Sequence, residues 1–299
     1  MILHYHIYKN AGTTVEAVLE REFGLFFATI EGGGATGALT NAELLAFLES
    51  HDTLLAISSH QIRYPRPASD RFEFFDICFI RHPLDRLFSH YSFLRKPQVT
   101  DPLTDAARTM DLAGFCSFLL ERHPEYTDNP QTALLLHRGD TSSVSTADAR
   151  AARSLVREIS VLGVVEAFDE SLMLAEYTLH PWFPHLRMHY VPQNVTNSAD
   201  IGFEHRLDVI RSSCGEELYA RLAAASELDL VLWREAQAEL QRRLEARPEH
   251  EIWLEEFRRR TDRYQGGPRL RDRLLQRMHI PTARSVKVQR GDKAPASVG

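Results

Sequence analysis

The chain has 299 residues, and its 35 lysines and arginines against 41 aspartates and glutamates give a formal net charge of −6. Hydrophobic residues make up 43% of the sequence and charged residues 25%, as in a globular protein with a sizeable core. These proportions exclude a disordered, collagen-like or disulfide-scaffold chain. The acidic balance also argues against a general nucleic-acid-binding protein, because such proteins normally carry a basic excess.

The sequence carries no sign of membrane insertion or export. Its apolar runs stay well short of the ~18 residues that a spanning helix needs, and its first residues lack the basic and apolar regions of a signal peptide. The three cysteines are widely spaced and form no CxxC pair, which indicates free thiols in a reducing compartment. We therefore expect a cytoplasmic protein.

Short apolar runs alternate with helical patterns along the first 180 residues. The apolar runs predict β-strands at 2–8, 53–58, 74–80 and 161–165. The spacing of apolar and capping residues predicts helices at 15–23, 40–49, 83–95, 111–122, 146–158 and 169–180. This alternation is typical of an α/β fold in which helices cover both faces of a parallel sheet. Residues 203–263 have an almost continuous helical pattern, which predicts a mainly helical C-terminal part.

No linker divides the sequence into two independent domains. We therefore expect a single domain over residues 1–281. Residues 282–299 are basic, contain proline and glycine and show no periodicity, which predicts a flexible tail.

The first candidate site follows the first predicted strand, where residues 6–14 read H-I-Y-K-N-A-G-T-T. A strand, a short glycine-containing turn and a helix leave unpaired N–H groups at the helix N-terminus, which is a ready anion site. Lys9 adds a positive charge, and Thr13 and Thr14 add hydroxyl donors. The motif is not a Walker A loop, because its lysine precedes the glycine and the upstream glycine is missing. The simpler interpretation is a structural turn with a solvated lysine.

The second candidate site follows the third predicted strand, where residues 79–91 read F-I-R-H-P-L-D-R-L-F-S-H-Y. Arg81 leaves the strand at its carboxyl end, which is where ligands bind in open α/β sheets. Ser89 lies eight residues further on, about two helical turns, so an arginine and a hydroxyl can converge on a phosphate. The alternative is that Arg81 pairs with a nearby carboxylate.

Together, the two motifs resemble the cofactor motifs of sulfotransferases that use 3′-phosphoadenosine 5′-phosphosulfate, in particular the carbohydrate branch of the heparan and chondroitin type. Residues 6–14 match that family's H-I-P-K-[TA]-[AG]-G-[TS]-[TS] pattern, and residues 81–91 match its R-D-P-x-x-R-x-x-S-x-Y pattern. Residues 163–172 resemble its G-x-x-E-x-F-D-x-S-L segment, and residues 227–233 resemble its closing helix. The resemblance therefore spans roughly residues 4–245. Three positions depart from the patterns, namely Tyr8, Asn10 and His82.

The resemblance implies a P-loop NTPase-like fold and assigns roles to residues of both motifs. The 5′-phosphosulfate would be held by Lys9 together with the N–H groups of Asn10, Ala11, Gly12, Thr13 and Thr14. Arg81 and Ser89 would hold the 3′-phosphate. Lys9 would also neutralise charge on the leaving phosphate, with adenosine 3′,5′-bisphosphate as product and no metal required. The acceptor class that this branch implies is a hydroxyl of a saccharide or glycoconjugate.

A general base is needed to remove the proton of the acceptor hydroxyl. His60 follows the second predicted strand and resembles the family's G-H motif, whose histidine is the proposed base. An unperturbed histidine pKa of about 6.5 suits proton abstraction near neutrality. The simpler interpretation is a surface or helix-capping histidine.

Two other functions remain open on the sequence alone. A P-loop small-molecule kinase would need a carboxylate at the end of an apolar strand, where this chain has Arg81. A non-catalytic protein that binds adenosine bisphosphate would not need both Lys9 and His60. We expect no metal site, because the histidines near the N-terminus form no HExxH pattern and lack thiolate partners.

Overall fold

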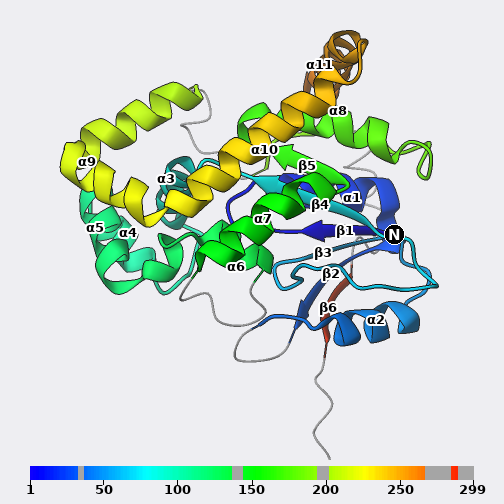
Figure 1. The fold of residues 1–299 in the computed structure, drawn as a ribbon, viewed down its shortest axis with the longest axis horizontal. Helices are drawn as coiled ribbons and strands as arrows, with labels where there is room; N and C mark the ends of the chain where they lie inside the picture. The colour runs from blue at the N-terminus through cyan, green and yellow to red at the C-terminus, as the bar shows by residue number, and fades with distance from the viewer. Residues whose placement is uncertain (33–36, 137–143, 194–201, 267–283, 289–299) are drawn as a thin grey trace, which may run out of the picture.

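Six parallel strands form the centre of the structure, a computed structural model that describes residues 1–32, 37–136, 144–193, 202–266 and 284–288 (Figure 1). The strands are β1 (Ile2–Tyr5), β2 (Phe27–Gly32), β3 (Ala56–Ser59), β4 (Phe75–Ile80), β5 (Val161–Val164) and β6 (Arg284–Val288). Their order in the sheet is β5-β4-β1-β3-β2-β6. The predicted α/β fold with a parallel sheet is thus confirmed.

β1, β3, β4 and β5 are buried along their whole length, because helices cover the sheet on both faces. This burial explains why β4 has the nearly unbroken apolar sequence F-D-I-C-F-I. β1 lies between β3 and β4, with Tyr5 opposite Ser59 on one side and Cys78 on the other. The loops that follow these three strands therefore leave the sheet at the same edge.

Most helices of the first two thirds of the chain lie against this sheet or beside it. They are α1 (Gly12–Phe23), α2 (Asn41–Ser50), α3 (Pro83–Leu94), α4 (Thr104–Thr109), α5 (Leu112–Arg122), α6 (Pro130–Leu136), α7 (Thr146–Glu158) and α8 (Phe168–Leu179). The predicted capping box at Thr40 and Glu43 begins α2, and Asp111 caps α5 as predicted. Short 3-10 turns follow α1 (η1, Gly24–Phe26), α5 (η2, Pro124–Tyr126) and β5 (η3, Val165–Ala167).

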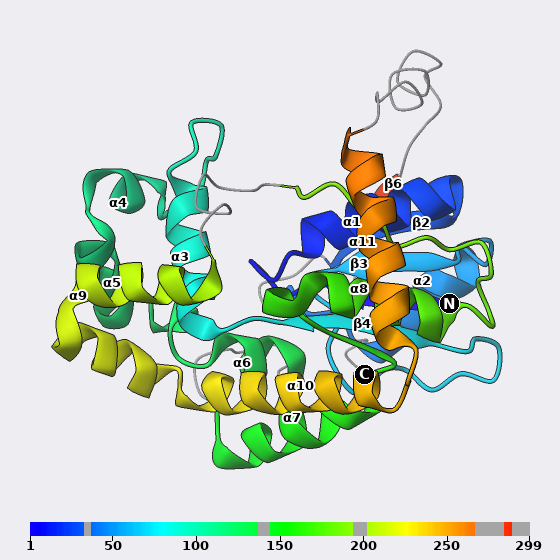
Figure 2. The same cartoon turned by 90° about the horizontal axis from the view of Figure 1, so that it is seen from above.

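The C-terminal part is mainly helical, as predicted. Its helices are α9 (Phe203–Ala225), which bends at Gly215, α10 (Glu227–Glu245) and α11 (His250–Gly266). Figure 2 shows α1 on one side of the sheet and α6, α7 and α10 on the other. A second apolar cluster joins α3, α4, α5 and α9, and this group of helices lies beyond the carboxyl ends of the strands (Figure 1).

Three features of the sheet differ from the sequence prediction. β1 ends at Tyr5 rather than at residue 8, because the chain leaves the sheet at His6 to form the turn before α1. β2 was not predicted, since α1 passes through η1 directly into the strand without a polar turn. Arg284–Val288, in the stretch predicted to be a flexible tail, forms β6 beside β2. The remainder of that tail lies outside the described residues.

Two smaller predictions concern the membrane and the thiols. Among the described residues, no helix is both long and apolar enough to cross a membrane. Cys78, Cys116 and Cys214 are free, as the sequence indicated.

Candidate anion-binding and catalytic site

The two sequence motifs come together at the carboxyl edge of the sheet. The 6–14 turn follows β1, Arg81 follows β4, and these strands are neighbours. The Arg81 guanidinium donates a hydrogen bond from Nη1 to the Lys9 carbonyl over 3.0 Å. In open α/β sheets this edge is where ligands bind, so both motifs lie where a ligand is expected.

The 6–14 turn has a tight backbone that brings it against the His6 ring. Lys9 and Ala11 have positive φ angles of 66° and 59°, and α1 begins immediately afterwards. At Gly12 an added Cβ would lie only 1.9 Å from Cδ2 of His6, so a glycine is required there by close approach. The His6 ring therefore packs beneath the turn.

The N-terminus of α1 offers fewer free donors than predicted. The N–H of Asn10 donates to the Ile7 carbonyl, and that of Thr14 donates to the Ala11 carbonyl. Within the described part of the chain, no acceptor is found for the N–H groups of residues 11–13. Because α1 also lacks a capping side chain and an acidic residue in its first turn, three backbone donors remain for an anion.

The side chains of Asn10 and Thr14 make hydrogen bonds within the protein that hold the turn in place. The Asn10 amide is buried and donates to the Phe79 carbonyl and to Oε1 of Gln131, each over 2.7 Å. Gln131 also accepts from the N–H of Arg81 and donates to its carbonyl. The Thr14 hydroxyl accepts a hydrogen bond from the N–H of Gln193. The departure at Asn10 from the family pattern thus has a structural role, because it fastens the turn to the end of β4.

The Lys9 amine lies in a cationic environment. Its Nζ atom is 3.8 Å from the centre of the Phe93 ring, which is a cation–π contact. Burial, followed by the charge of Arg81 and other nearby cations, lowers the pKa of Lys9 to about 7 from its usual 10.5. No carboxylate is paired with Lys9 among the described residues. An anion bound here would offset the repulsion between Lys9 and the neighbouring cations.

Arg81 is paired with a carboxylate, as the alternative interpretation of its motif anticipated. Its Nη2 atom lies 2.8 Å from Oδ2 of Asp85, one helical turn further on. Asp85 is fully buried and also pairs with Arg206 of α9 over 2.6 Å. These two arginines lower the pKa of Asp85 despite its burial, which favours the proton-bound form. Two guanidiniums around one carboxylate leave a net positive charge.

Ser89 and Arg86 lie on α3, the helix that follows Arg81 and carries Asp85. Ser89 is half-buried, and no hydrogen bond to Arg81 or Lys9 is found for its hydroxyl within the described residues. Arg86 is buried, donates to the Tyr126 carbonyl, and has an Nε atom without a partner in the described structure. The structure therefore joins Arg81 to the Lys9 turn but does not join Ser89 to it.

His60 lies at the end of β3 with one ring nitrogen fixed. Its Nδ1 atom is 2.7 Å from the His6 carbonyl oxygen, which can only accept, so Nδ1 carries the proton and Nε2 keeps its lone pair. The residue is exposed, and its ring lies 3.9 Å from that of His6. Loss of hydration around the ring, followed by the electrostatic effect of the neighbouring His6, lowers the pKa of His60 to about 4. At neutral pH the ring is therefore an uncharged proton acceptor.

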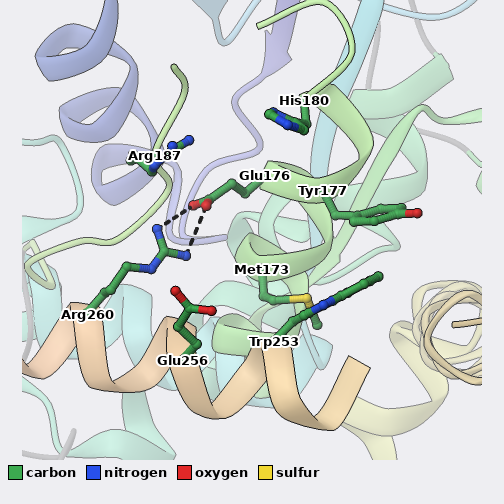
Figure 3. A pocket seen from close by; sticks show the side chains of 8 residues that line it. All are labelled: Met173, Glu176, Tyr177, His180, Arg187, Trp253, Glu256 and Arg260. Atoms are coloured by element: carbon green, nitrogen blue, oxygen red, sulfur yellow. Dashed lines mark hydrogen bonds and ion pairs between the residues drawn. The ribbon is translucent and has the colours of Figure 1, made fainter. Parts of the chain in front are cut away.

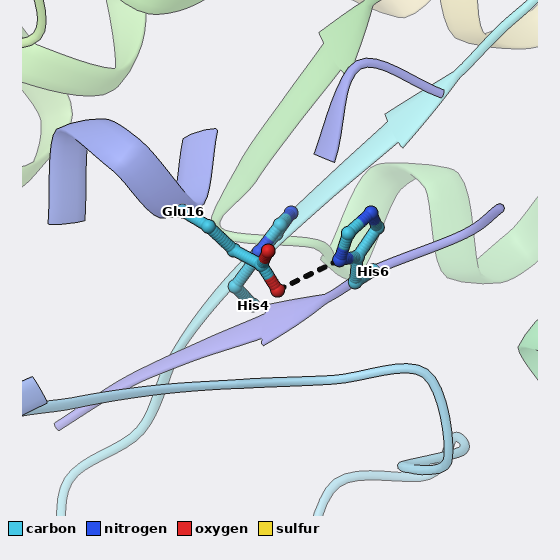
Figure 4. Close-up of side chains that lie close together, drawn as sticks. All are labelled: His4, His6 and Glu16. Carbon is cyan, nitrogen blue, oxygen red and sulfur yellow. Dashed lines mark hydrogen bonds and ion pairs between the residues drawn. The ribbon is translucent and has the colours of Figure 1, made fainter. Parts of the chain in front are cut away.

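Behind His60 lies a chain of hydrogen bonds that the sequence did not reveal. Ser58 donates its hydroxyl to Oε1 of Glu16 over 2.7 Å, and the same oxygen is 2.8 Å from Nδ1 of His6 (Figure 4). His4 lies 2.8 Å from the Ser58 hydroxyl. In the sequence, only the placement of His4 and His6 on one face of a strand pointed toward this cluster, and nothing distinguished Glu16 from other exposed-face residues of a helix.

His4, His6 and Glu16 are also the one group in the described residues with three candidate metal ligands close together, within 4.8 Å of one another. Their ligand atoms are occupied by hydrogen bonds to each other and to Ser58. Burial lowers the pKa of His4 to about 3, which keeps that ring uncharged. The three side chains and Ser58 thus form one hydrogen-bonded network.

A cavity of about 300 Å³ lies elsewhere, between α8 and α11 (Figure 3). Tyr177 and Trp253 stack at 4.5 Å in its wall, and Arg260 pairs with Glu176 across it. None of the residues predicted for the site lines this cavity. The Arg260–Glu176 pair balances charge within this cavity, in contrast to the cations around Lys9.

Comparisons with known proteins give a relative but no activity. A protein of Archaeoglobus fulgidus, described as uncharacterized, is 28% identical over 239 residues, which cover 78% of this chain and 94% of that protein. No protein-family model matches the chain.

Proposed function

We propose that this protein is a sulfotransferase that moves the sulfuryl group of 3′-phosphoadenosine 5′-phosphosulfate onto a hydroxyl of a saccharide or glycoconjugate. The observation that carries the proposal is the meeting, around the 6–14 turn, of a neutral His60 with a lysine and three N–H groups that have no acceptor among the described residues. The proposal includes two further points. The 6–14 turn binds phosphate in the manner of a P-loop, and the acceptor is cytoplasmic.

Each group has a distinct task in the proposed transfer. His60 accepts the proton of the acceptor hydroxyl on Nε2, while its Nδ1 proton stays hydrogen-bonded to the His6 carbonyl. The acceptor oxygen bonds to sulfur as the bond between sulfur and the phosphate oxygen breaks. Lys9 and the N–H groups of residues 11–13 then stabilise the negative charge that collects on the departing phosphate, with no metal required.

The 3′-phosphate of the donor would bind to Arg81 and the cations beside it. Arg81 keeps N–H groups that neither Asp85 nor the Lys9 carbonyl uses, because a guanidinium has five. The surrounding excess of positive charge favours a small, highly charged nucleotide over a neutral ligand. The overall net charge of −6 does not oppose such a local site.

Two rival functions place different demands on the site. A kinase would need a carboxylate at the carboxyl end of β4, but the carboxylate of that strand, Asp76, lies near its start and pairs with Arg66. A protein that only binds the nucleotide would have no use for the fixed lone pair of His60.

Binding followed by turnover separates the three functions. We expect calorimetry to detect adenosine 3′,5′-bisphosphate binding and weaker binding of ATP with Mg²⁺, and donor turnover to appear with pooled saccharide acceptors. Preference for ATP would point to a kinase. Tight bisphosphate binding without turnover across the acceptor pool would point to the non-catalytic protein.

A histidine variant tests the proposed base. His60→Ala should lower turnover by about 10²- to 10⁴-fold, the range of general base catalysis, and leave bisphosphate affinity unchanged. His185→Ala removes another exposed histidine and serves as the matched control. Loss of binding with turnover intact would assign the base to a different residue.

A further inference from the structure

Glu16 contacts His6, the residue that links the 6–14 turn to the proposed base His60. Its carboxylate is 2.8 Å from Nδ1 of His6, and because a carboxylate only accepts, the His6 nitrogen carries the proton. Although burial opposes ionisation, the hydrogen bond and the electrostatic interaction with His6, followed by those with His4 and Ser58, lower the pKa of Glu16 to about 2. Glu16 is therefore ionised at every pH at which the protein would work.

His6 contacts both Gly12 in the 6–14 turn and the proposed base His60. Its ring fills the space beside Gly12, where even a Cβ would lie at 1.9 Å. Its carbonyl accepts the Nδ1 proton of His60, and its ring lies 3.9 Å from the His60 ring. A shift of His6 would thus displace both the 6–14 turn and His60.

Ser58 ties Glu16 to the strand that carries the base. Its hydroxyl has one proton, which it donates to Glu16, so it accepts from Nδ1 of His4. β1, β3 and α1 each contribute one or more members of this chain. The tautomer of each histidine in it is fixed by its partner.

The charged groups around His60 differ in sign. His4 and His6 lie on the β1 side, and Arg63 lies three residues after His60 and donates to its carbonyl. His6 and Arg63 oppose a proton on His60, Glu16 favours one, and the uncharged His4 adds no charge. Glu16 is the carboxylate that offsets an imidazolium at this position.

We propose that Glu16 is a positioning residue for the base, which holds His6 in place through its hydrogen bond and supplies the negative charge that the protonated His60 requires. This inference rests on the proposed function for its catalytic consequence. Its structural content, the coupling of Glu16 to His60, does not depend on the reaction.

Glu16→Gln tests the proposal because it keeps the shape and removes the charge. We expect kcat to fall by about ten- to a hundredfold, with donor KM and bisphosphate affinity within twofold of the wild type. The acid limb of the kcat/KM profile should move to lower pH, because His60 holds its proton less tightly without the carboxylate. Glu16→Asp, which keeps the charge, should leave that limb near its wild-type position.

Glu20→Gln, one turn further along α1, is the matched control and should behave as the wild type. Nitrogen-15 NMR of the histidines gives a readout without turnover, in which His60 should keep its proton on Nδ1 and show a lower pKa in Glu16→Gln. An unmoved His60 pKa, or an equal loss of kcat and bisphosphate affinity, would overturn the proposal. Absence of sulfotransfer in the wild type with a shifted His60 pKa would instead refute the proposed function alone.

Discussion

At the scale of single residues, the most informative group is Lys9. Among the described residues Lys9 has no carboxylate partner, and its burial and the neighbouring cations destabilise its charged form and lower its pKa to about 7. Such an arrangement costs stability in the free protein and lowers the cost of binding an anion. Lys9 thus differs from Arg81, whose charge is already partly neutralised by Asp85.

Anion binding should therefore be coupled to proton uptake by Lys9. A bound bisphosphate raises the pKa of Lys9, so the amine should gain about half a proton at pH 7, more at pH 8 and almost none at pH 6. Calorimetry in two buffers of different ionisation enthalpy measures this uptake. Lys9→Arg, which stays protonated, corrects for protons exchanged by the ligand itself, and equal uptake in both proteins would contradict the assignment.

At the scale of elements, the turn between β1 and α1 determines the site. The sequence predicted a strand, a turn and a helix here, and the structure confirms them with the strand three residues shorter. The free donors come from the helix N-terminus, but the position of the turn comes from Asn10 and from the close contact of Gly12 with His6.

Gly12→Ala should abolish the anion site while the protein still folds. The added methyl group would collide with the His6 ring, so the turn or the ring must move, at a cost of about 1–3 kcal/mol in the free energy of unfolding. Bisphosphate binding by calorimetry and chemical denaturation measure the two effects. Gly202→Ala, where an added Cβ meets no atom within 4 Å, is the control. Wild-type affinity in Gly12→Ala would show that the turn is not the binding element.

At the scale of the whole molecule, the site depends on a buried connection between the C-terminal helices and the sheet edge. Asp229 of α10 accepts hydrogen bonds from the N–H groups of Gln131 and Thr132 at the start of α6. In return, Asn129 accepts from the N–H of Asp229 itself. Since Gln131 contacts both Asn10 and Arg81, α10 supports the junction of the two motifs from a distance.

Asp229→Ala should destabilise the protein and weaken the site together. The change leaves two N–H groups and the Thr132 hydroxyl buried without an acceptor, which costs about 3–5 kcal/mol in the free energy of unfolding. Chemical denaturation measures this loss. Asp208→Ala removes an exposed aspartate of α9 and should change stability by less than about 0.5 kcal/mol. A small loss at Asp229 would mean that water replaces the carboxylate.

The sequence by itself determined the local features of this protein. Apolar runs of β-branched and aromatic residues specified β1, β3, β4 and β5, and capping residues specified the starts of α2 and α5, because both signals act between near neighbours. The two motifs identified Lys9 and Arg81 and placed each of them after a strand, while the structure showed that these two strands are neighbours. β2 was missed because α1 leads into it through η1 without a polar turn, and β6 was missed because it pairs with β2 from the other end of the sequence.

Only the tertiary structure decided which side chains meet. It paired Arg81 with Asp85, used Asn10 and Thr14 inside the turn, and linked His60 through His6 to Glu16. Such contacts depend on the angles at which strands and helices cross, and no local pattern carries that information. The acidic net charge of −6 is likewise a sum over the surface, whereas the cationic group around Lys9 exists only because the fold brings the loop after β1 and α3 together.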